Sequence, residues 1–368
     1  NAKTGEVIWN HSIDTQLEVI RDYAAYDLRA APLIAGSKII QGVVGSFVPT
    51  GAFIVALDAE TGEEAWRFQT LARPGEPGGN TWNDLPLDQR SGGSVWIPGS
   101  YDSDLNLAYF GVAPTYHTPR LTYAVDIDGV TNDALYTNST LALNADTGEL
   151  VWHYQHMPND QWDLDWTFER LLIDLELDGE NRRVVMNVGK SAILEANDAS
   201  TGEYLFSVDM GLQNIITAID PITGAKTINP DTFPRREGAY NICPNAVGAR
   251  SWPPSGYNPE SKRLFVPLVE GCFKAGSEGN PLLLTEIPVQ IQAHPASSDG
   301  NMGRIQVIDL ETRQLAWRHR QQTPIISSLL ATGGDLVFSG DLEPSLKAFD
   351  EATGEILWQT TLSDAPSA

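Results

Sequence analysis

The chain has 368 residues, of which 42% are hydrophobic and 9% aromatic, and its formal net charge is -24 at pH 7. A surface this acidic repels phosphate backbones, which excludes nucleic acid as a partner. No segment approaches the roughly 20 apolar residues of a membrane helix, so membrane association is not indicated. Length alone suggests two or three domains, unless the chain is built from repeats.

One short phrase recurs from the first residue to the last tenth of the chain. It consists of an Asp or Asn, two or three further residues, Thr-Gly, and an aromatic residue four positions after the glycine. Its copies end at Trp9, Trp66, Trp152, Phe206 and Trp358, and a variant with Arg313 in place of the glycine ends at Trp317. Repetition of this kind indicates one repeat architecture rather than several unrelated domains.

The residues around each copy predict a β-hairpin. Alternating apolar segments precede several copies, at 53–58, 139–144 and 304–309. The Asp-x-x-Thr-Gly turn offers side-chain hydrogen bonds and a glycine for a positive φ angle. The aromatic residue then begins a return strand and can pack between neighbouring sheets. Because helical periodicity is nearly absent, we expect an all-β fold.

The spacing of the aromatic residues gives the number of sheets. Successive aromatics lie 57, 86, 54, 111 and 41 residues apart. The interval of 86 can hold one sheet with a long insertion, and the interval of 111 can hold an additional sheet around 263–271. We therefore expect about six sheets of propeller-blade size. A β-sandwich whose turns are similar by accident is the alternative.

Four longer segments carry a family resemblance. HYQHMPNDQWDLDW at 153–166, SGGSVWIPGSYDSDLNLAYFG at 91–111, the segment 241–272 and the segment 331–358 resemble stretches of the pyrroloquinoline quinone (PQQ) alcohol dehydrogenases. The resemblance implies an eight-bladed β-propeller of the quinoprotein dehydrogenase type, with about six blades in this chain. Residues 1–368 are then one PQQ-binding domain, incomplete at both ends.

In this family an alcohol is oxidised with the help of a base and a cation beside the quinone. The resemblance assigns the base to Asp163, which is also a metal ligand. The alternative for Asp163 is a turn aspartate that caps backbone groups. Asp165 matches the additional carboxylate ligand of the lanthanide-using branch, if a strand-like segment turns both carboxylates to one side. A solvent-exposed acid is the alternative for Asp165.

Two usual metal ligands are absent from this sequence. Phe47 stands where the family has a metal-binding Glu, and no Asn occurs in 113–120, where the family has its metal-binding Asn. Tyr116, His117 and Thr118 are the nearby candidates. The metal is therefore calcium, a lanthanide, or none if the site is inactive.

Four residues carry over to the cofactor pocket from one part of the chain. Trp96 matches the tryptophan that stacks on the quinone, with core packing as the alternative. Ser94 matches a neighbouring hydroxyl that binds the cofactor. Gly45 and Ser46 match a Gly-Ala pair that lies near it.

Three further residues complete the predicted pocket. Lys190 aligns within one residue of the cation beside the reactive carbonyls, with an exposed lysine as the alternative. Arg29 could pair with a carboxylate of PQQ, with a surface salt bridge as the alternative. Ser251 replaces an Asn and keeps a polar group beside Trp252.

The two cysteines, Cys243 and Cys272, have the separation of the family's structural disulfide. A disulfide implies an oxidising compartment, hence the periplasm, whereas two free buried thiols are the alternative. No Cys-x-x-Cys-His haem motif occurs in this segment, so electrons would pass to a separate c-type cytochrome, to another acceptor or to a domain outside the segment.

Two functions compete on this sequence. The first is PQQ- and metal-dependent oxidation of an alcohol to an aldehyde or ketone. The second is a cofactor-free periplasmic scaffold like the outer-membrane assembly lipoprotein, which shares the docking phrase. Loss of the metal-binding Glu and Asn favours the scaffold, whereas Trp96, Lys190, the Trp162-Asp163 pair and the cysteine spacing favour the enzyme.

Overall fold

A computed structural model describes residues 1, 3–13, 26–177, 179–235, 238–281 and 287–366. The chain forms two compact units, which are described separately. Unit 1 comprises Asn1–Arg170 with Ser200–Gly202, and unit 2 comprises Leu171–Ala199 with Glu203–Ala368. Helix is limited, in the described residues, to short 3-10 turns, namely η1 (Gly79–Thr81), η2 (Leu87–Gln89), η3 (Thr118–Arg120), η4 (Pro230–Thr232) and η5 (Pro295–Ser297). None of these is long and apolar enough to cross a membrane.

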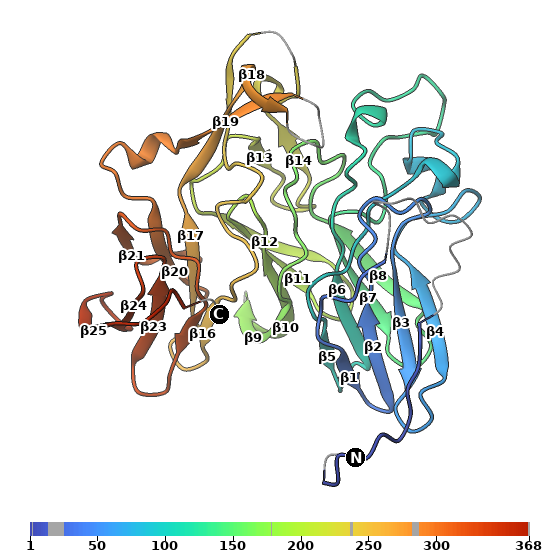
Figure 1. Ribbon diagram of the computed structural model, residues 1–368, viewed down its shortest axis with the longest axis horizontal. Helices are drawn as coiled ribbons and strands as arrows, with labels where there is room; N and C mark the ends of the chain where they lie inside the picture. The colour runs from blue at the N-terminus through green and yellow to red at the C-terminus, as the bar shows by residue number, and fades with distance from the viewer. Residues whose placement is uncertain (2, 14–25, 178, 236–237, 282–286, 367–368) are drawn as a thin grey trace. The chain divides into compact units, whose positions relative to one another are not determined.

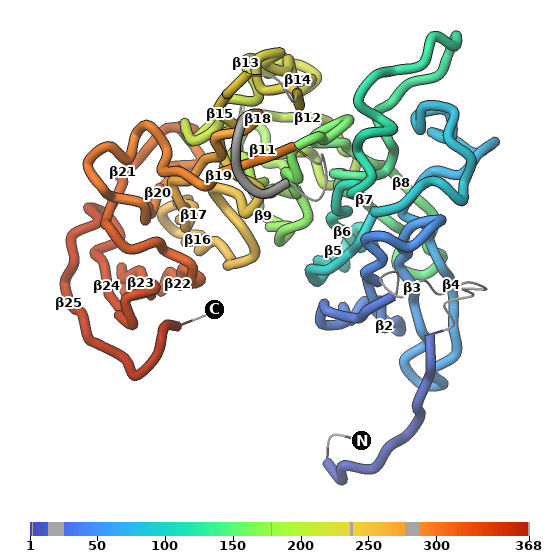
Figure 2. The backbone as a smooth tube through the Cα atoms, turned by 45° about the horizontal axis from the view of Figure 1, so that its top comes forward, coloured from blue at the N-terminus to red at the C-terminus, as the bar shows by residue number. Residues whose placement is uncertain are grey.

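Unit 1 contains two four-stranded antiparallel sheets, in each of which the strands lie in chain order. The first sheet consists of β1 (Leu33–Ala35), β2 (Lys38–Gly42), β3 (Phe53–Asp58) and β4 (Glu64–Gln69). The second consists of β5 (Ser100–Asp102), β6 (Leu107–Gly111), β7 (Ser139–Asn144) and β8 (Leu150–Gln155). Figures 1 and 2 show the two sheets side by side. One core joins them, with Ile54 of β3 and Phe110 of β6 among its buried residues.

Unit 2 contains three further sheets with the same strand order. They consist of β9 (Leu171–Leu177), β10 (Glu180–Val188), β11 (Ile193–Asp198) and β12 (Tyr204–Asp209); of β16 (Gly256–Asn258), β17 (Arg263–Val269), β20 (Gly303–Asp309) and β21 (Gln314–Gln321); and of β22 (Leu329–Ala331), β23 (Leu336–Asp341), β24 (Ser345–Asp350) and β25 (Ile356–Thr361). Two smaller sheets accompany them, formed by β13 (Ile216–Ile219) with β14 (Lys226–Ile228), and by β15 (Tyr240–Ile242), β18 (Gly271–Pro281) and β19 (Pro288–Ala293). The all-β prediction is confirmed.

The prediction of a separate sheet around 263–271 is wrong. That segment contains β17, which pairs with β20 in the sheet that ends at Trp317. The long interval before Trp317 holds the small sheets of β13–β14 and β15–β18–β19 instead. The described residues therefore form five four-stranded sheets, and the phrase ending at Trp9 precedes the first of them. The count of about six blades stays a prediction.

The recurrent phrase forms the predicted turn. In its second copy, Asp58 Oδ1 accepts hydrogen bonds from the backbone N–H groups of Glu60 and Thr61, at 3.0 and 3.1 Å. These donors hold the pKa of Asp58 below its ordinary value. Gly62 follows with a φ angle of 75°. A polar side chain thus replaces missing backbone partners, and the glycine adopts the left-handed conformation that the turn requires.

The glycine has a second purpose, which is to make room for a tryptophan from the preceding copy of the phrase. A Cβ atom at Gly148 would lie 2.5 Å from the Trp66 ring, and the Trp66 indole N–H donates to Ala145 O at 3.0 Å. Trp317 docks on Gly354 in the same way, with its indole N–H donating to Glu351 O at 2.7 Å. Each docked indole links consecutive copies of the repeat.

The variant copy shows how the docking works without glycine. Arg313 adopts a φ angle of 60°, and its guanidinium carbon lies 4.9 Å from the centre of the Phe206 ring. A cation above an aromatic face thus replaces an indole on a glycine. The turn alone does not mark a propeller sheet, because Asp220 forms the same turn with Thr223 in the isolated β13–β14 hairpin.

Candidate functional site

The loop after β8 presents the two predicted catalytic and metal-binding carboxylates. Asp160 organises this loop, because its carboxylate accepts hydrogen bonds from the backbone N–H groups of Trp162 and Leu164, at 2.8 and 2.6 Å, and from the Asn138 amide at 2.8 Å. Burial nevertheless raises the pKa of Asp160, against the lowering effect of these donors. Asp160 is therefore the backbone-capping aspartate of the loop.

Asp163 and Asp165 follow in an unusual backbone conformation. Asp163 has a φ angle of 65° and a partly buried side chain, and Asp165 is only 3% exposed. The premise of a strand-like segment is wrong, because residues 161–167 lie outside every strand and Asp163 is left-handed. A left-handed non-glycine residue is held there by its surroundings, and such residues concentrate at functional sites. The alternative of an exposed acid at Asp165 does not hold either.

The charges of Asp163 and Asp165 both influence the pKa of the Tyr116 phenol. The pKa of Tyr116 is raised well above its ordinary value, first by burial and then by the charges of Asp165, Asp163 and Asp160, while a hydrogen bond with Ser46 opposes the rise. The carboxylates of this loop and the Ser46 hydroxyl are hard oxygen donors of the kind that Ca²⁺ and lanthanide ions prefer.

An aromatic cluster lies beside this group. The Phe47 ring centre is 5.6 Å from that of Tyr116 and 5.8 Å from that of His117. His117 is exposed, and its Nδ1 is hydrogen-bonded to Ser91 Oγ at 2.6 Å. Phe47, at the position where the family has a Glu, therefore contributes a ring and no ligand atom.

Three of the predicted cofactor residues meet at a single point. Ser94 Oγ accepts a hydrogen bond from the Gly45 backbone N–H at 3.0 Å and lies 3.3 Å from Ser46 Oγ. Ser46 is also hydrogen-bonded to the Tyr116 hydroxyl. Gly45 itself is required by packing, since a Cβ atom there would lie 2.8 Å from the Tyr26 ring.

Trp96 lies two residues after Ser94 and is partly buried. Its ring meets the Phe168 ring edge to face, at 5.7 Å and 90°. Phe168 comes from the end of the carboxylate loop, and the nearby Trp166 ring stacks on His156 at 4.7 Å. Aromatic packing therefore fixes both Trp96 and the loop that carries Asp163.

Arg29 lies apart from this group. Its Nε donates to Asp27 Oδ2 at 2.7 Å, and 67% of the Arg29 side chain is exposed. This is the surface ion pair that the sequence allowed as the alternative, and such pairs contribute little to stability.

Lys190 and Ser251 belong to unit 2, where a backbone hydrogen bond joins the segments that carry them. Lys190 is 6% exposed, so the alternative of an exposed lysine is wrong. Its backbone oxygen accepts from Ala249 N at 2.9 Å, and a Cβ atom at Gly248 would lie 2.6 Å from Lys190 Cγ. Ser251 is partly buried two residues after Ala249.

The predicted disulfide is confirmed. Cys243 and Cys272 are bonded, with their Cα atoms 4.4 Å apart, and the bridge joins the start of β18 to the segment after β15. His294 lies beside the two sulfur atoms, but the disulfide removes both thiolates as metal ligands.

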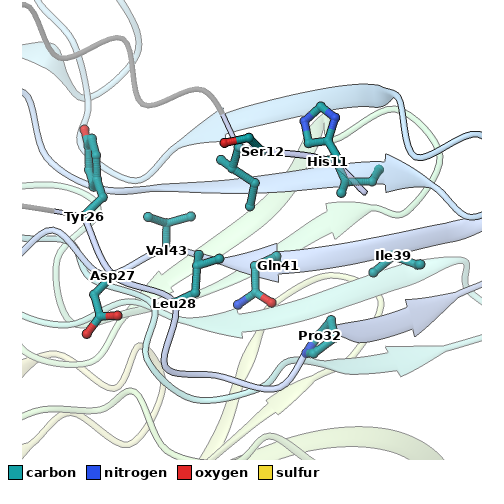
Figure 3. A pocket seen from close by; sticks show the side chains of 11 residues that line it. His11, Ser12, Tyr26, Asp27, Leu28, Pro32, Ile39, Gln41 and Val43 are labelled. Atoms are coloured by element: carbon teal, nitrogen blue, oxygen red, sulfur yellow. The ribbon is translucent and has the colours of Figure 1, made fainter. Parts of the chain in front are cut away.

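Two pockets lie in unit 1. A polar pocket of about 370 Å³ adjoins the aromatic cluster, with Phe47, Arg90, Ser91, His117 and Arg120 in its wall. A pocket of about 600 Å³ lies over β2, and Figure 3 shows Ile39 and Gln41 of that strand, and Val43 just after it, beneath His11 and Ser12. Its described lining contains none of the predicted site residues, so we do not assign the chemistry to it.

Residues 1–212 match the family described as the glucose/ethanol/alcohol dehydrogenase β-propeller domain. The chain belongs to this quinoprotein dehydrogenase family. Residues 301–367 also match the family described as the outer membrane protein assembly factor BamB. The chain thus has the β-propeller fold of the quinoprotein dehydrogenases.

Several relatives are similar to nearly the whole chain. The quinohemoprotein alcohol dehydrogenase ADH-IIG of Pseudomonas putida is 31% identical over 98% of this chain and 52% of the relative. Lupanine 17-hydroxylase [cytochrome c] of a Pseudomonas species is 30% identical over 90% of this chain and 49% of the relative. The chain therefore spans about half the length of the curated relatives it matches.

Solved structures agree with this result. The structure of quinohemoprotein alcohol dehydrogenase ADHIIG from Pseudomonas putida HK5 superposes with a TM-score of 0.81 and 28% identity, covering 100% of this chain and 56% of that one. A europium-containing methanol dehydrogenase superposes with a TM-score of 0.81 at 23% identity, covering 92% of this chain and 62% of that one, which shows the fold alone.

The residues of unit 1 fit the cation and the quinone that the family implies. Asn138 is buried, and its Oδ1 has no hydrogen-bond partner although its amide nitrogen donates to Asp160. An orphaned buried oxygen beside a carboxylate calls for an ion or a water molecule. Ser94, Ser46 and Trp96 offer the hydroxyl groups and the indole that a flat polar cofactor needs.

The sequence did not reveal three residues of this site. Asp160 and Asn138 organise the loop through hydrogen bonds between segments 22 residues apart, a pairing that no local pattern shows. Tyr116 was one of three neighbouring candidates, and only the structure distinguishes it from His117. Asp160 is a charged residue within the stretch that resembles the family, and this charge is the sequence signal that could have identified it.

Proposed function

We propose that this propeller oxidises an alcohol to an aldehyde or ketone in a reaction that depends on PQQ and a metal ion. The meeting of Ser94, Ser46 and the Gly45 N–H carries this proposal, together with the loop that holds the left-handed Asp163 and the buried Asp165. Family membership supports it, because two of the relatives are quinohemoprotein alcohol dehydrogenases by name.

The chain's own residues have distinct tasks in this reaction. Asp163 accepts the proton of the substrate hydroxyl, and with Asp165 it holds the cation. Trp96 supports the flat face of the cofactor, while Ser94, Ser46 and the Gly45 segment bind its polar edge. When bound, PQQ supplies the electron-accepting carbonyl and the metal ion polarises it.

Two residues of unit 2, Lys190 and Ser251, stay predictions as cofactor-binding groups. Lys190 stabilises negative charge at the cofactor, because a buried ammonium is a strong electrostatic partner. Ser251 offers a hydroxyl beside Trp252. Arg29 pairs with Asp27 on the surface, and its bond to a carboxylate of PQQ stays a prediction.

We further propose that the protein works in the periplasm and passes electrons to a c-type cytochrome or another acceptor. The Cys243–Cys272 disulfide supports an oxidising compartment. A relative whose name includes cytochrome c supports the acceptor.

The test is dye-linked alcohol oxidation by the full-length protein. Asp163→Asn preserves the shape of the side chain and removes the base, so turnover should fall by about 10²- to 10⁴-fold. Asp126→Asn, which changes an exposed aspartate of the same unit, is the matched control and should leave turnover unchanged. Equal activity of the two variants would remove Asp163 as the base.

A cofactor-free scaffold is the second candidate function. The match of residues 301–367 to the BamB family and the ring of Phe47 in place of a ligand favour it. A scaffold needs neither a buried Lys190 nor a buried Asp165 next to a left-handed Asp163, which is why we place it second. It predicts that protein from a PQQ-producing source carries no quinone.

A further inference from the structure

The polar pocket of about 370 Å³ in unit 1 has two arginines in its wall. The whole chain carries twice as many acidic as basic side chains, 48 against 24. In the described lining of this pocket the balance is reversed, because Arg90 and Arg120 are accompanied by a single acid, the exposed Asp88. A pocket with this charge attracts an anion, although the protein as a whole repels one.

Arg90 is a buried cation, and none of the described carboxylates forms an ion pair with it. Only 2% of Arg90 is exposed. Its Nε, Nη1 and Nη2 atoms donate to the backbone oxygens of Leu85, Ala72 and Gly79, at 2.9, 2.5 and 2.9 Å. These neutral acceptors fix the guanidinium in place but leave its charge without a counterion in contact. A buried charge of this kind gains from an anion beside it.

Arg120 is the second cation of the pocket, and it is exposed. Its Nη1 donates to the neutral Gln89 Oε1 at 3.1 Å, and within the described part of the chain it forms no ion pair. A guanidinium has more N–H donors than this one bond uses. Arg120 can therefore form a bidentate contact with a carboxylate, for which the planar guanidinium is well suited.

The pocket adjoins the residues proposed to bind the cofactor. Phe47 in its wall directly follows Ser46, and Ser91 precedes Ser94 by three residues. The Oγ atoms of Ser46 and Ser94 lie 3.3 Å apart, so both wall segments lead to the same pair of hydroxyl groups. An anion held by the arginines would therefore lie beside the place where the alcohol is oxidised.

We propose that this pocket binds a carboxylate of the substrate, so that the preferred substrates are alcohols that also carry a carboxylate. This inference rests on the proposed function of the site and names the class of alcohol that it oxidises. Arg120 contacts the carboxylate, and the buried Arg90 adds positive charge to the same pocket. Because charge-assisted hydrogen bonds are roughly twice as strong as neutral ones, the pocket distinguishes a hydroxycarboxylate from a neutral alcohol.

The first experiment measures binding without turnover, by calorimetric titration of the full-length protein with hexanoate and, separately, with the neutral hexanamide. Hexanoate should bind at least about tenfold more tightly, because only its carboxylate can pair with the arginines. Arg120→Gln should weaken hexanoate binding by about tenfold or more, whereas Arg120→Lys keeps the charge and should retain part of the affinity. Arg73→Gln removes an arginine of the same unit outside the described lining and should bind hexanoate as the wild type does.

The second experiment tests whether the pocket serves the substrate. Dye-linked oxidation is measured for a series of ω-hydroxycarboxylates and for the diols of equal length. At the best length, the hydroxycarboxylate should have a KM at least about tenfold below that of its diol. Arg120→Gln should raise the KM for the hydroxycarboxylate and leave its kcat unchanged, as expected for a group that binds substrate and transition state equally.

Three results would overturn the proposal. Hexanoate could bind no more tightly than hexanamide, Arg120→Gln could bind hexanoate normally, or no hydroxycarboxylate could have a lower KM than its diol. Inorganic phosphate is titrated in the same way, and binding of phosphate without binding of hexanoate would also overturn the carboxylate assignment.

These results are separable from the test of the proposed function. If Asp163→Asn abolishes alcohol oxidation while hexanoate does not bind, the enzyme stands and the carboxylate pocket fails. If hexanoate binds through Arg120 but the protein oxidises no alcohol, the proposed function fails together with the substrate role of the pocket, although carboxylate binding stands.

Discussion

The docking of each tryptophan on a glycine predicts a large effect from a single methyl group. Gly148 has a φ angle of 73°, and a Cβ atom there would lie 2.5 Å from Trp66. The left-handed conformation costs alanine about 1–2 kcal/mol. Displacing the indole removes its hydrogen bond to Ala145, which contributes about 1 kcal/mol. The buried Trp66 ring also loses van der Waals contacts, which costs about 1 kcal/mol more. Gly148→Ala should therefore destabilise the protein by about 3–4 kcal/mol.

Gly129→Ala separates the two causes. Gly129 has nearly the same φ angle, 74°, but nothing lies within 4 Å of its Cβ position. This variant should lose only the conformational part, about 1–2 kcal/mol. The assay is urea unfolding of the full-length protein, with both variants compared with the wild type. If the two losses agree to within about 0.5 kcal/mol, the tryptophan contact contributes nothing and the account of docking is refuted.

Three other predictions follow from particular contacts. Replacing Cys243 and Cys272 by serine should lower the free energy of unfolding by about 3–4 kcal/mol, measured in urea, and no loss would contradict a structural role for the disulfide. Burial raises the pKa of Glu270, but hydrogen bonds from Arg320 and Ser297 and the charge of Arg304 outweigh it and hold the pKa below 4.5. The stability that Glu270 contributes is therefore present above pH 4.5 and is lost as the pH falls through its lower folded pKa. When the urea midpoint is measured as a function of pH, Glu270→Gln should reduce the fall of the midpoint at acid pH, and an unchanged fall would contradict the role of Glu270. Lys190→Met should retain PQQ but lower turnover about 100-fold, and unchanged turnover would remove its electrostatic role.

The repeat architecture could be predicted from sequence because its signal is local. An Asp, a Thr and a Gly within five residues determine the turn, and Asp58 shows the expected hydrogen bonds. The sheet containing β17 was misassigned because the phrase marks only the outer strand, and here that strand follows a long insertion. Asp220 shows the converse, since the turn also closes a simple hairpin.

The candidate site was predictable only where a motif named the residue. Asp163 and Asp165 could be proposed in this way, although the segment that carries them is a loop with a left-handed Asp163 and not a strand. Tyr116 could not be selected over His117, because which side chain points inward depends on contacts with Ser46 and Ser91. Arg29 is hydrogen-bonded to Asp27, which lies only two residues away, so this ion pair could have been predicted from the sequence.

The most direct test of the central claim is to purify the full-length protein from its native, PQQ-producing source, denature it, and identify any released small molecule by absorption and mass spectrometry. The account predicts stoichiometric release of PQQ. Release of no quinone would contradict it and make the cofactor-free scaffold the better description of this propeller.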